Sequence, residues 1–109
     1  QKHHIIPQQL KGHDLIKAAD FNIHDIKNVI YLPKSADYHP TRTIHSGSHP
    51  VYTKNIGDQM DAIYEYGKEN GWKQAEYKQA VSEIIKNERA DLRGGKTILN
   101  KNSVRKARC

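Results

Sequence analysis

The chain of 109 residues carries a formal net charge of +6, and 36% of its residues are hydrophobic. This length suits one compact domain, and no apolar run in the sequence approaches the ~20 residues that a membrane-spanning helix needs. The single cysteine, Cys109, excludes both an internal disulfide and a cysteine-based zinc site.

The first half of the chain predicts two short strands with a small helix between them. Residues 2–6 form a candidate strand that stops at a proline, which cannot donate a ladder hydrogen bond. Residues 28–32 are β-branched and aromatic, stop at a second proline, and predict a strand that pairs with the first. The connection 8–27 should hold one short helix near residues 14–20. Residues 34–49 are rich in Ser, Thr, Gly, His and Pro, which favours loop or broken helix.

The second half predicts two helices. Apolar residues recur after Pro50 at the spacings of one helical face, namely Tyr52, Ile56, Met60, Ile63 and Tyr64. Pro50 suits the first turn of this helix, and Gly71 suits its end. A second helix should end at Gly94, with an apolar side made of Tyr77, Val81, Ile84, Ile85 and Leu92. We expect Trp72 to pack onto the strand pair and residues 97–99 to be extended.

Positive charge is concentrated near the end of the chain. Residues 1–49 carry six Lys/Arg against four Asp/Glu, residues 50–92 carry six against eight, and residues 93–109 carry six against none. A basic tail can bind a polyanion, although a solvated terminus would have the same composition. We therefore interpret residues 1–109 as a single domain with a core (1–70), a helical extension (71–93) and a basic tail (94–109).

Histidines are confined to the first half, where they predict a functional site because imidazoles titrate near neutral pH and bind metals. They are His3, His4, His13, His24, His39, His45 and His49. Neighbouring strand residues point to opposite faces, so His3 and His4 can take different roles. His45 and His49 are four residues apart, which on a helix turns both imidazoles toward one metal. Gly47 and Pro50 leave the helical geometry of that segment open.

The other candidates are more ambiguous. His39 could replace His45 as a metal ligand or contact phosphate, and Arg42 could meet a phosphate through its planar guanidinium. We expect His13 and His24 to be surface residues. Three neutral imidazoles on one ion would leave coordination positions open, as a catalytic metal requires. Together with a histidine base, such an ion would suit phosphodiester hydrolysis.

Three blocks of sequence, in this order, resemble the AHH family of the HNH/endonuclease VII superfamily. They begin at Lys2-His3-His4-Ile5-Ile6-Pro7, at Asp25-Ile26-Lys27-Asn28 and at His45-Ser46-Gly47-Ser48-His49, and they span residues 2–56. The resemblance implies an α+β fold of the ββα-metal type, in which a hairpin and a helix hold one divalent ion. The helices and tail after residue 56 are not covered by the resemblance and rest on the apolar spacing and composition described above. Lys2 departs from the alanine of the family motif and could place a cation near a phosphate.

The resemblance also implies roles for individual residues. His3, His45 and His49 would be metal ligands, His4 the general base, and Asn28 the residue that ties the hairpin to the site. Imidazole ligands suit Zn²⁺, which we expect, or Ni²⁺, and the superfamily also admits Mg²⁺. DNA would be the substrate, gripped through its backbone by basic side chains without sequence reading. These are Lys2, Lys101, Arg105, Lys106 and Arg108.

The family occurs as toxin domains at the C-termini of bacterial polymorphic toxins. Because the chain starts at Gln1 rather than Met, we expect a monomeric domain of a longer protein, delivered from the producing bacterium into the target-cell cytoplasm and neutralised by an acidic immunity protein. Two other functions stay open. One is a non-catalytic, zinc-stabilised nucleic-acid-binding module with His39 as fourth ligand. The other is an RNase on the same scaffold, which would favour aromatic stacking platforms.

Overall fold

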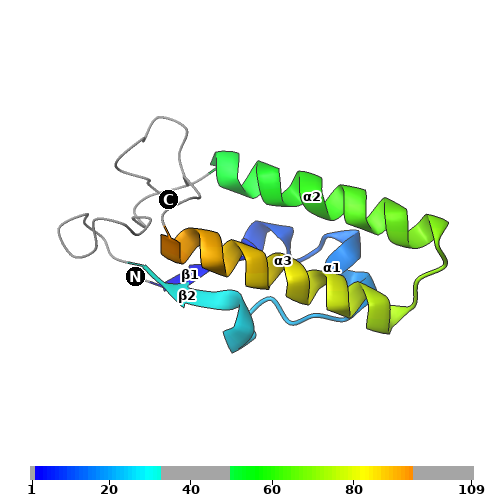
Figure 1. Ribbon diagram of the computed structural model, residues 1–109, viewed down its shortest axis with the longest axis horizontal. Coiled ribbons are helices and arrows are strands. Elements are labelled where there is room, and N and C mark those ends of the chain that lie inside the picture. Colours follow the sequence, from blue (N-terminus) through cyan, green and yellow to red (C-terminus); the bar gives the residue numbers. More distant parts are fainter. Residues whose placement is uncertain (1, 33–49, 95–109) are drawn as a thin grey trace.

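The structure is a computed structural model that describes residues 2–32 and 50–94. It is an α+β fold in which an antiparallel strand pair precedes two long helices, as the sequence predicts (Figure 1). The elements in chain order are β1 (Lys2–His4), η1 (Gln8–Leu10), α1 (Asp14–Ala19), η2 (Ile26–Asn28), β2 (Val29–Tyr31), α2 (Pro50–Glu69) and α3 (Gln74–Gly94).

The strand pair is shorter than predicted. Its register sets Lys2 opposite Tyr31, His3 opposite Ile30 and His4 opposite Val29. After His4, the N–H of Ile5 still donates to the backbone carbonyl of Asn28 at 2.8 Å. At Ile6 a side chain takes over, because both backbone groups of Ile6 bond to the side-chain amide of Asn28. The predicted ends of both strands therefore lie outside the ladder.

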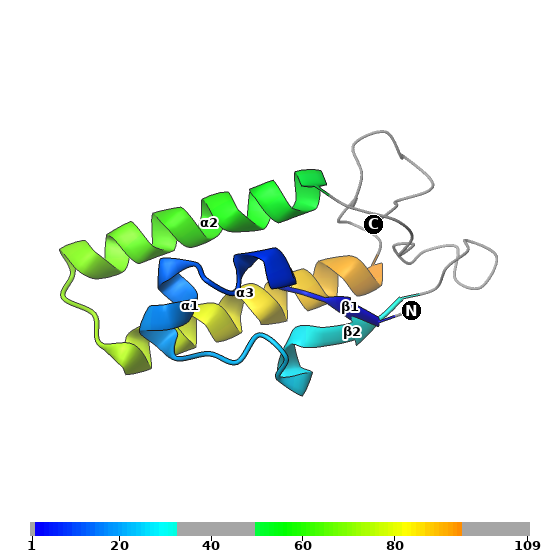
Figure 2. The same cartoon turned by 180° about the vertical axis from the view of Figure 1, so that it is seen from behind.

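The two long helices lie side by side and run in opposite directions (Figure 1). The strand pair lies at the end where α2 begins and α3 ends, and Figure 2 shows α1 and the loop after β1 lying across the helix pair from behind. Gly71 joins the helices with a φ of +64°, a left-handed conformation that glycine adopts without strain. No helix within residues 2–32 and 50–94 has the length and apolar character to cross a membrane.

One hydrophobic core joins the hairpin to the helices. Ile5 and Ile6 follow β1 directly and are fully buried, and they share this core with Leu15 of α1, Met60 of α2 and Val81 of α3. Since each element buries its apolar side in the same cluster, the position of β1 relative to the start of α2 is set by packing.

His13 has a structural role that differs from the expected surface position. Its Nδ1 accepts the backbone N–H of Leu15 at 3.0 Å and so caps α1, while Nε2 lies 2.6 Å from a carboxylate oxygen of Asp61 on α2. Only 14% of the side chain is exposed. The imidazole thus ties the beginning of α1 to the middle of α2.

Trp72 does not pack onto the strand pair. It lies at the opposite end of the molecule, where its ring centroid is 5.5 Å from that of Tyr66 and 5.6 Å from that of Tyr77. Gly67 makes room for this cluster, because a Cβ at that position would lie 2.8 Å from the Trp72 ring. The prediction failed because the space left by Gly67, five positions earlier in the chain, is visible only in three dimensions.

Candidate active site

Neighbouring positions on β1 give His3 and His4 different surroundings. His3 is only 2% exposed, and its ring lies 5.5 Å, centroid to centroid, from the ring of Tyr52 in the first turn of α2. His4 is partly exposed. Strand alternation accounts for the contrast, and it presents one imidazole toward the helix and the other toward solvent.

Asn28 and Tyr52 hold this strand end in place. The fully buried side chain of Asn28 accepts the N–H of Ile6 at 2.7 Å and donates to the carbonyls of Ile6 at 3.0 Å and Ile23 at 2.8 Å. From the other side, the Tyr52 hydroxyl donates to the carbonyl of Ile5 at 2.7 Å. Buried hydrogen bonds of this kind are costly to break, because the partners left behind are cut off from water.

Both ring nitrogens of His4 have polar neighbours. Nε2 lies 3.2 Å from Nδ1 of His24, and Nδ1 lies 3.3 Å from the amide nitrogen of Gln8. Partial burial lowers the pKa of His4, and the nearby His24 and Lys2 lower that pKa further. A lowered pKa favours the neutral imidazole, which is the form that can accept a proton from water.

His24 is a neighbour of the site that the sequence did not reveal. It is exposed, as expected, yet it stands edge-on to His4 with ring centroids 5.2 Å apart. The two histidines are twenty positions apart, and only the fold of the connecting loop brings them together. Asn22 stabilises that loop by accepting the N–H of His24 at 3.0 Å, and the Asn-x-His pattern of such a turn was the only available signal.

Several predicted site residues lie outside the described part of the chain. They are His39, Arg42, His45, His49, Lys101, Arg105, Lys106 and Arg108. Within residues 2–32 and 50–94, no three side chains able to ligate a metal come together. Of the proposed ligands, the described residues contain His3 alone. His49 directly precedes Pro50, the first residue of α2, and is three positions before the Tyr52 ring that contacts His3.

A basic stripe lies on α3 beside the hairpin. We define it as Lys86, Arg89 and Arg93, which recur at helical spacing, together with Lys27 of η2. Lys27, Lys86 and Arg89 line a pocket of about 270 Å³. Arg89 donates to the carbonyls of Val29, at 3.2 Å, and Lys27. Its pKa is lowered by partial burial and by the charge of Arg93, so these two guanidinium groups repel each other.

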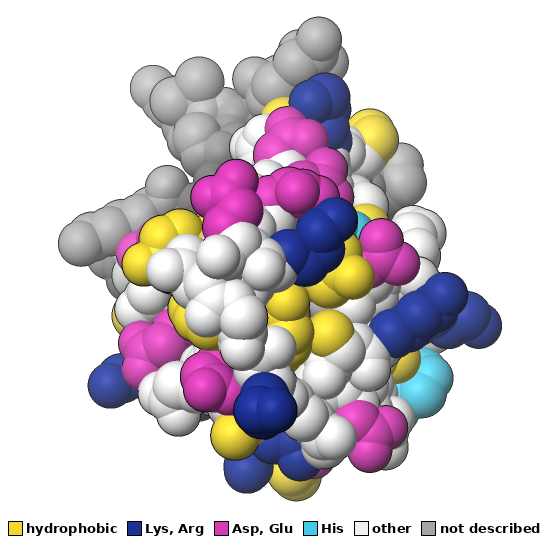
Figure 3. Space-filling view, turned by 90° about the vertical axis from the view of Figure 1, so that its right-hand side faces the viewer, with side chains coloured by type: hydrophobic (Ala, Val, Ile, Leu, Met, Phe, Trp, Pro, Cys, Tyr) yellow, Lys and Arg dark blue, Asp and Glu magenta, His cyan; other side chains and the backbone are white. Residues whose placement is uncertain are grey.

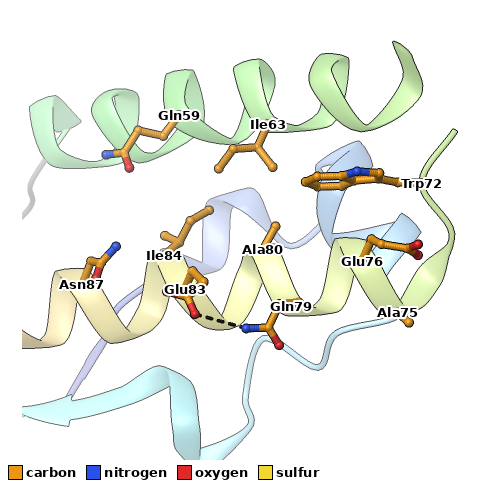
Figure 4. Close-up of a pocket in the computed structure, with 10 residues that line it drawn as sticks. All are labelled: Gln59, Ile63, Trp72, Ala75, Glu76, Gln79, Ala80, Glu83, Ile84 and Asn87. Carbon is orange, nitrogen blue, oxygen red and sulfur yellow. Dashed lines mark hydrogen bonds between the residues drawn. The ribbon is translucent and has the colours of Figure 1, made fainter. Parts of the chain in front are cut away.

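A larger groove of about 760 Å³ runs between α2 and α3 (Figure 4). Its lining is mainly apolar or amide, with Ile63, Trp72 and Ile84 inside and a hydrogen bond of 3.1 Å from Gln79 to Glu83 at its edge. None of the described histidines lines it. The groove is therefore separate from the paired histidines, and the candidate chemistry lies at the hairpin.

The site is thus a hairpin with two adjacent histidines, braced by a buried asparagine and packed on the first turn of a helix. The chain belongs to the AHH family, a nuclease family of the HNH/ENDO VII superfamily with conserved AHH, whose family model matches residues 1–89. No curated protein and no solved structure matches the chain. The match extends beyond the three sequence blocks and takes in most of α3. Lys2 stands where the motif has alanine.

Proposed function

We propose that this nuclease is a metal-dependent endonuclease that hydrolyses phosphodiester bonds in DNA, with His4 as its general base. The observation that carries the proposal is the contrast between His3 and His4 on one braced strand. His4 is partly exposed, and its surroundings favour the neutral ring. It can therefore take a proton from a water molecule as that water attacks phosphorus, a role that contributes about 10²–10⁴-fold in rate.

The described residues fit one side of a metal centre. His3 offers a buried imidazole against the first turn of α2, and neutral imidazole is a good ligand for Zn²⁺ or Ni²⁺. Mg²⁺ is kept as an alternative because the superfamily resemblance admits it. We propose His45 and His49 as the remaining ligands, with His39 as the substitute for His45. A bound divalent ion would supply positive charge for the phosphate and leaving oxygens. Nucleases of this superfamily generally use one.

Positive charge supports a nucleic acid as the substrate. Lys2 is exposed on the strand that carries His4, and the basic stripe lies beside β2. We propose that Lys2, the stripe, and Lys101, Arg105, Lys106 and Arg108 of the tail contact phosphates. Such contacts neutralise the backbone without reading bases. Arg42 is proposed as a contact to the scissile phosphate.

An RNase on the same scaffold is the second candidate. Tyr31, opposite Lys2 in the strand pair, is 68% exposed and could stack on an unpaired base. Single-strand readers use several such rings, and among the described residues Tyr31 is the one large exposed aromatic on the hairpin, so we favour duplex DNA. Membership of a nuclease family argues against a non-catalytic zinc module.

We further propose that the chain is the toxin domain of a bacterial polymorphic toxin, acts as a monomer in the target-cell cytoplasm, and is neutralised by an acidic immunity protein. The support is the family resemblance and the net charge of +6. An acidic partner would be attracted to the same basic surfaces as DNA, with association rates of up to about 10⁸–10⁹ M⁻¹s⁻¹ at low salt. Co-expression with the product of the neighbouring gene should restore the growth of a host that makes this chain.

The substrate is tested by digestion of supercoiled plasmid, linear duplex DNA and structured RNA in parallel, each with and without Zn²⁺, Mg²⁺ or Ni²⁺. We expect nicking of the plasmid that depends on an added ion. Cleavage of RNA alone would overturn the DNase assignment and select the second candidate.

A further inference from the structure

We propose that His24 is a positioning residue for His4 and, once water has replaced the Gln8 amide, keeps the ring nitrogen Nδ1 of His4 as the acceptor of the proton from water. The inference rests on the proposed function, since it takes His4 as the base. It starts from a contact between two imidazoles from different segments, β1 and the loop before η2, whose facing nitrogens are 3.2 Å apart.

The hydrogen-bonding chemistry selects one tautomer of His4. The amide nitrogen of Gln8 can only donate, so Nδ1 of His4, at 3.3 Å, must accept. In a neutral ring the proton is then on Nε2, which donates to Nδ1 of His24. His24 in turn carries its own proton on Nε2. The hydrogen bond thus runs from His4 to His24, and Nδ1 of His4 is the nitrogen that can accept a proton.

In this arrangement His4 can act as a base toward a water molecule after only a small rearrangement. Gln8 is exposed, so a water molecule can replace its amide and donate to Nδ1 of His4. The water proton moves to Nδ1 as the water oxygen bonds to phosphorus, the bond from phosphorus to the leaving oxygen breaks, and solvent water protonates that oxygen. His4 is then a cation, and its Nε2–H stays bonded to His24, which stabilises the charged ring.

Two hydrogen bonds hold the loop in position where it reaches His24. Its own N–H donates to the side chain of Asn22 at 3.0 Å. Its neighbour Ile23 is 5% exposed, and the carbonyl of Ile23 accepts Nδ2 of Asn28 at 2.8 Å. Asn28 therefore braces both the strand that carries His4 and the loop that carries His24, so the two imidazoles are placed by one buried side chain.

The test compares His24→Ala, His24→Asn and His24→Gln with the wild type. The Oδ1 atom of asparagine can occupy the place of Nδ1 of histidine, because both atoms are bonded to Cγ. The Oε1 atom of glutamine is one bond further from the backbone. We expect His24→Ala to lower kcat about 10- to 100-fold, the rate equivalent of a lost hydrogen bond to a charged group, with KM little changed. His24→Asn should recover most of that loss and His24→Gln should not. Because His24 is exposed, thermal melts of all variants should match.

A second readout is independent of activity. Nitrogen-15 NMR of the His4 ring should show the Nε2–H tautomer in the wild type and in Gln8→Ala, in which His24 is the remaining ring partner, and a mixture of tautomers in the double variant Gln8→Ala/His24→Ala. If Gln8→Ala alone loses the Nε2–H tautomer, or if the double variant keeps it, the proposal is overturned, whether or not the protein cleaves DNA. If the tautomer shifts as expected but the wild type cleaves neither DNA nor RNA with any ion, positioning stands and the proposed function falls.

Discussion

The side-chain amide of Asn28 hydrogen-bonds to both backbone groups of Ile6, accepting from its N–H at 2.7 Å and donating to its carbonyl at 3.0 Å. The same nitrogen also donates to Ile23 at 2.8 Å. Asn28→Ala would leave three buried backbone groups without this partner, and it should lower the free energy of unfolding by about 3 kcal/mol or more. Urea denaturation measures the loss.

Asn55→Ala is the matched control for Asn28→Ala. Asn55 is exposed on α2, so the same change of side chain there should alter the free energy of unfolding by less than about 0.5 kcal/mol. Equal effects at the two positions would contradict the bracing role of Asn28.

Two glycines of α2 should respond to alanine with opposite signs. A Cβ at Gly67 would lie 2.5 Å from the Tyr77 ring and 2.8 Å from the Trp72 ring, whereas a Cβ at Gly57 would meet Leu10 at an ordinary 3.6 Å. Gly67→Ala should therefore destabilise by about 1–3 kcal/mol through overpacking. Gly57→Ala should stabilise by up to about 1 kcal/mol through helix propensity. Thermal melts of the two variants check the pair, and a stabilising Gly67→Ala would show that the aromatic cluster is packed differently.

The lysines and arginines of the basic stripe should contribute more to DNA binding than lysines elsewhere on the surface do. Lys86→Ala and Arg93→Ala each remove one proposed phosphate contact, and each should reduce the slope of log K against log salt by about 0.9. Arg89 is left unchanged because it also holds backbone carbonyls. Fluorescence anisotropy of a labelled duplex over a salt series measures the slopes.

Lys73→Ala and Lys78→Ala serve as controls for the stripe, since both residues are exposed toward the other end of α3. Figure 3 looks at the end where α2 and α3 join and shows acidic and basic side chains interleaved with hydrophobic ones. Removing a cation from such a mixed surface should leave the slope almost unchanged. If the control substitutions reduce the slope as much as the stripe substitutions do, the basic stripe has no special role in DNA binding.

The sequence predicted the elements of this fold well because periodicity is a local property. The apolar spacing from Tyr52 onward predicted a helix from Pro50, and α2 spans Pro50–Glu69. The paired strands were also predicted, although Asn28 shortens them by bonding to Ile6. The positions of His3 and His4 on one strand followed from the sequence as well.

Contacts between distant segments could not be predicted in the same way. The pairing of His24 with His4 depends on the path of the loop, and Arg89 reaches the carbonyl of Val29 across sixty positions. His13 was predicted to be a surface residue because it lies in the long connection between the two strands, whereas its contacts are to the N–H of Leu15 and to Asp61 on another helix. Such side-chain to backbone and interhelical bonds leave no periodic trace in the sequence.

The most direct test of the account is the nicking of supercoiled plasmid by the wild type and by His4→Ala, each with and without a chelator. We predict that the wild type nicks plasmid, that a chelator stops it and added divalent ion restores it, and that His4→Ala is at least about 10²-fold slower. Because His4 is partly exposed, the variant should keep the wild-type melting temperature. A folded His4→Ala protein that nicks plasmid at the wild-type rate would contradict the assignment of His4 as the base.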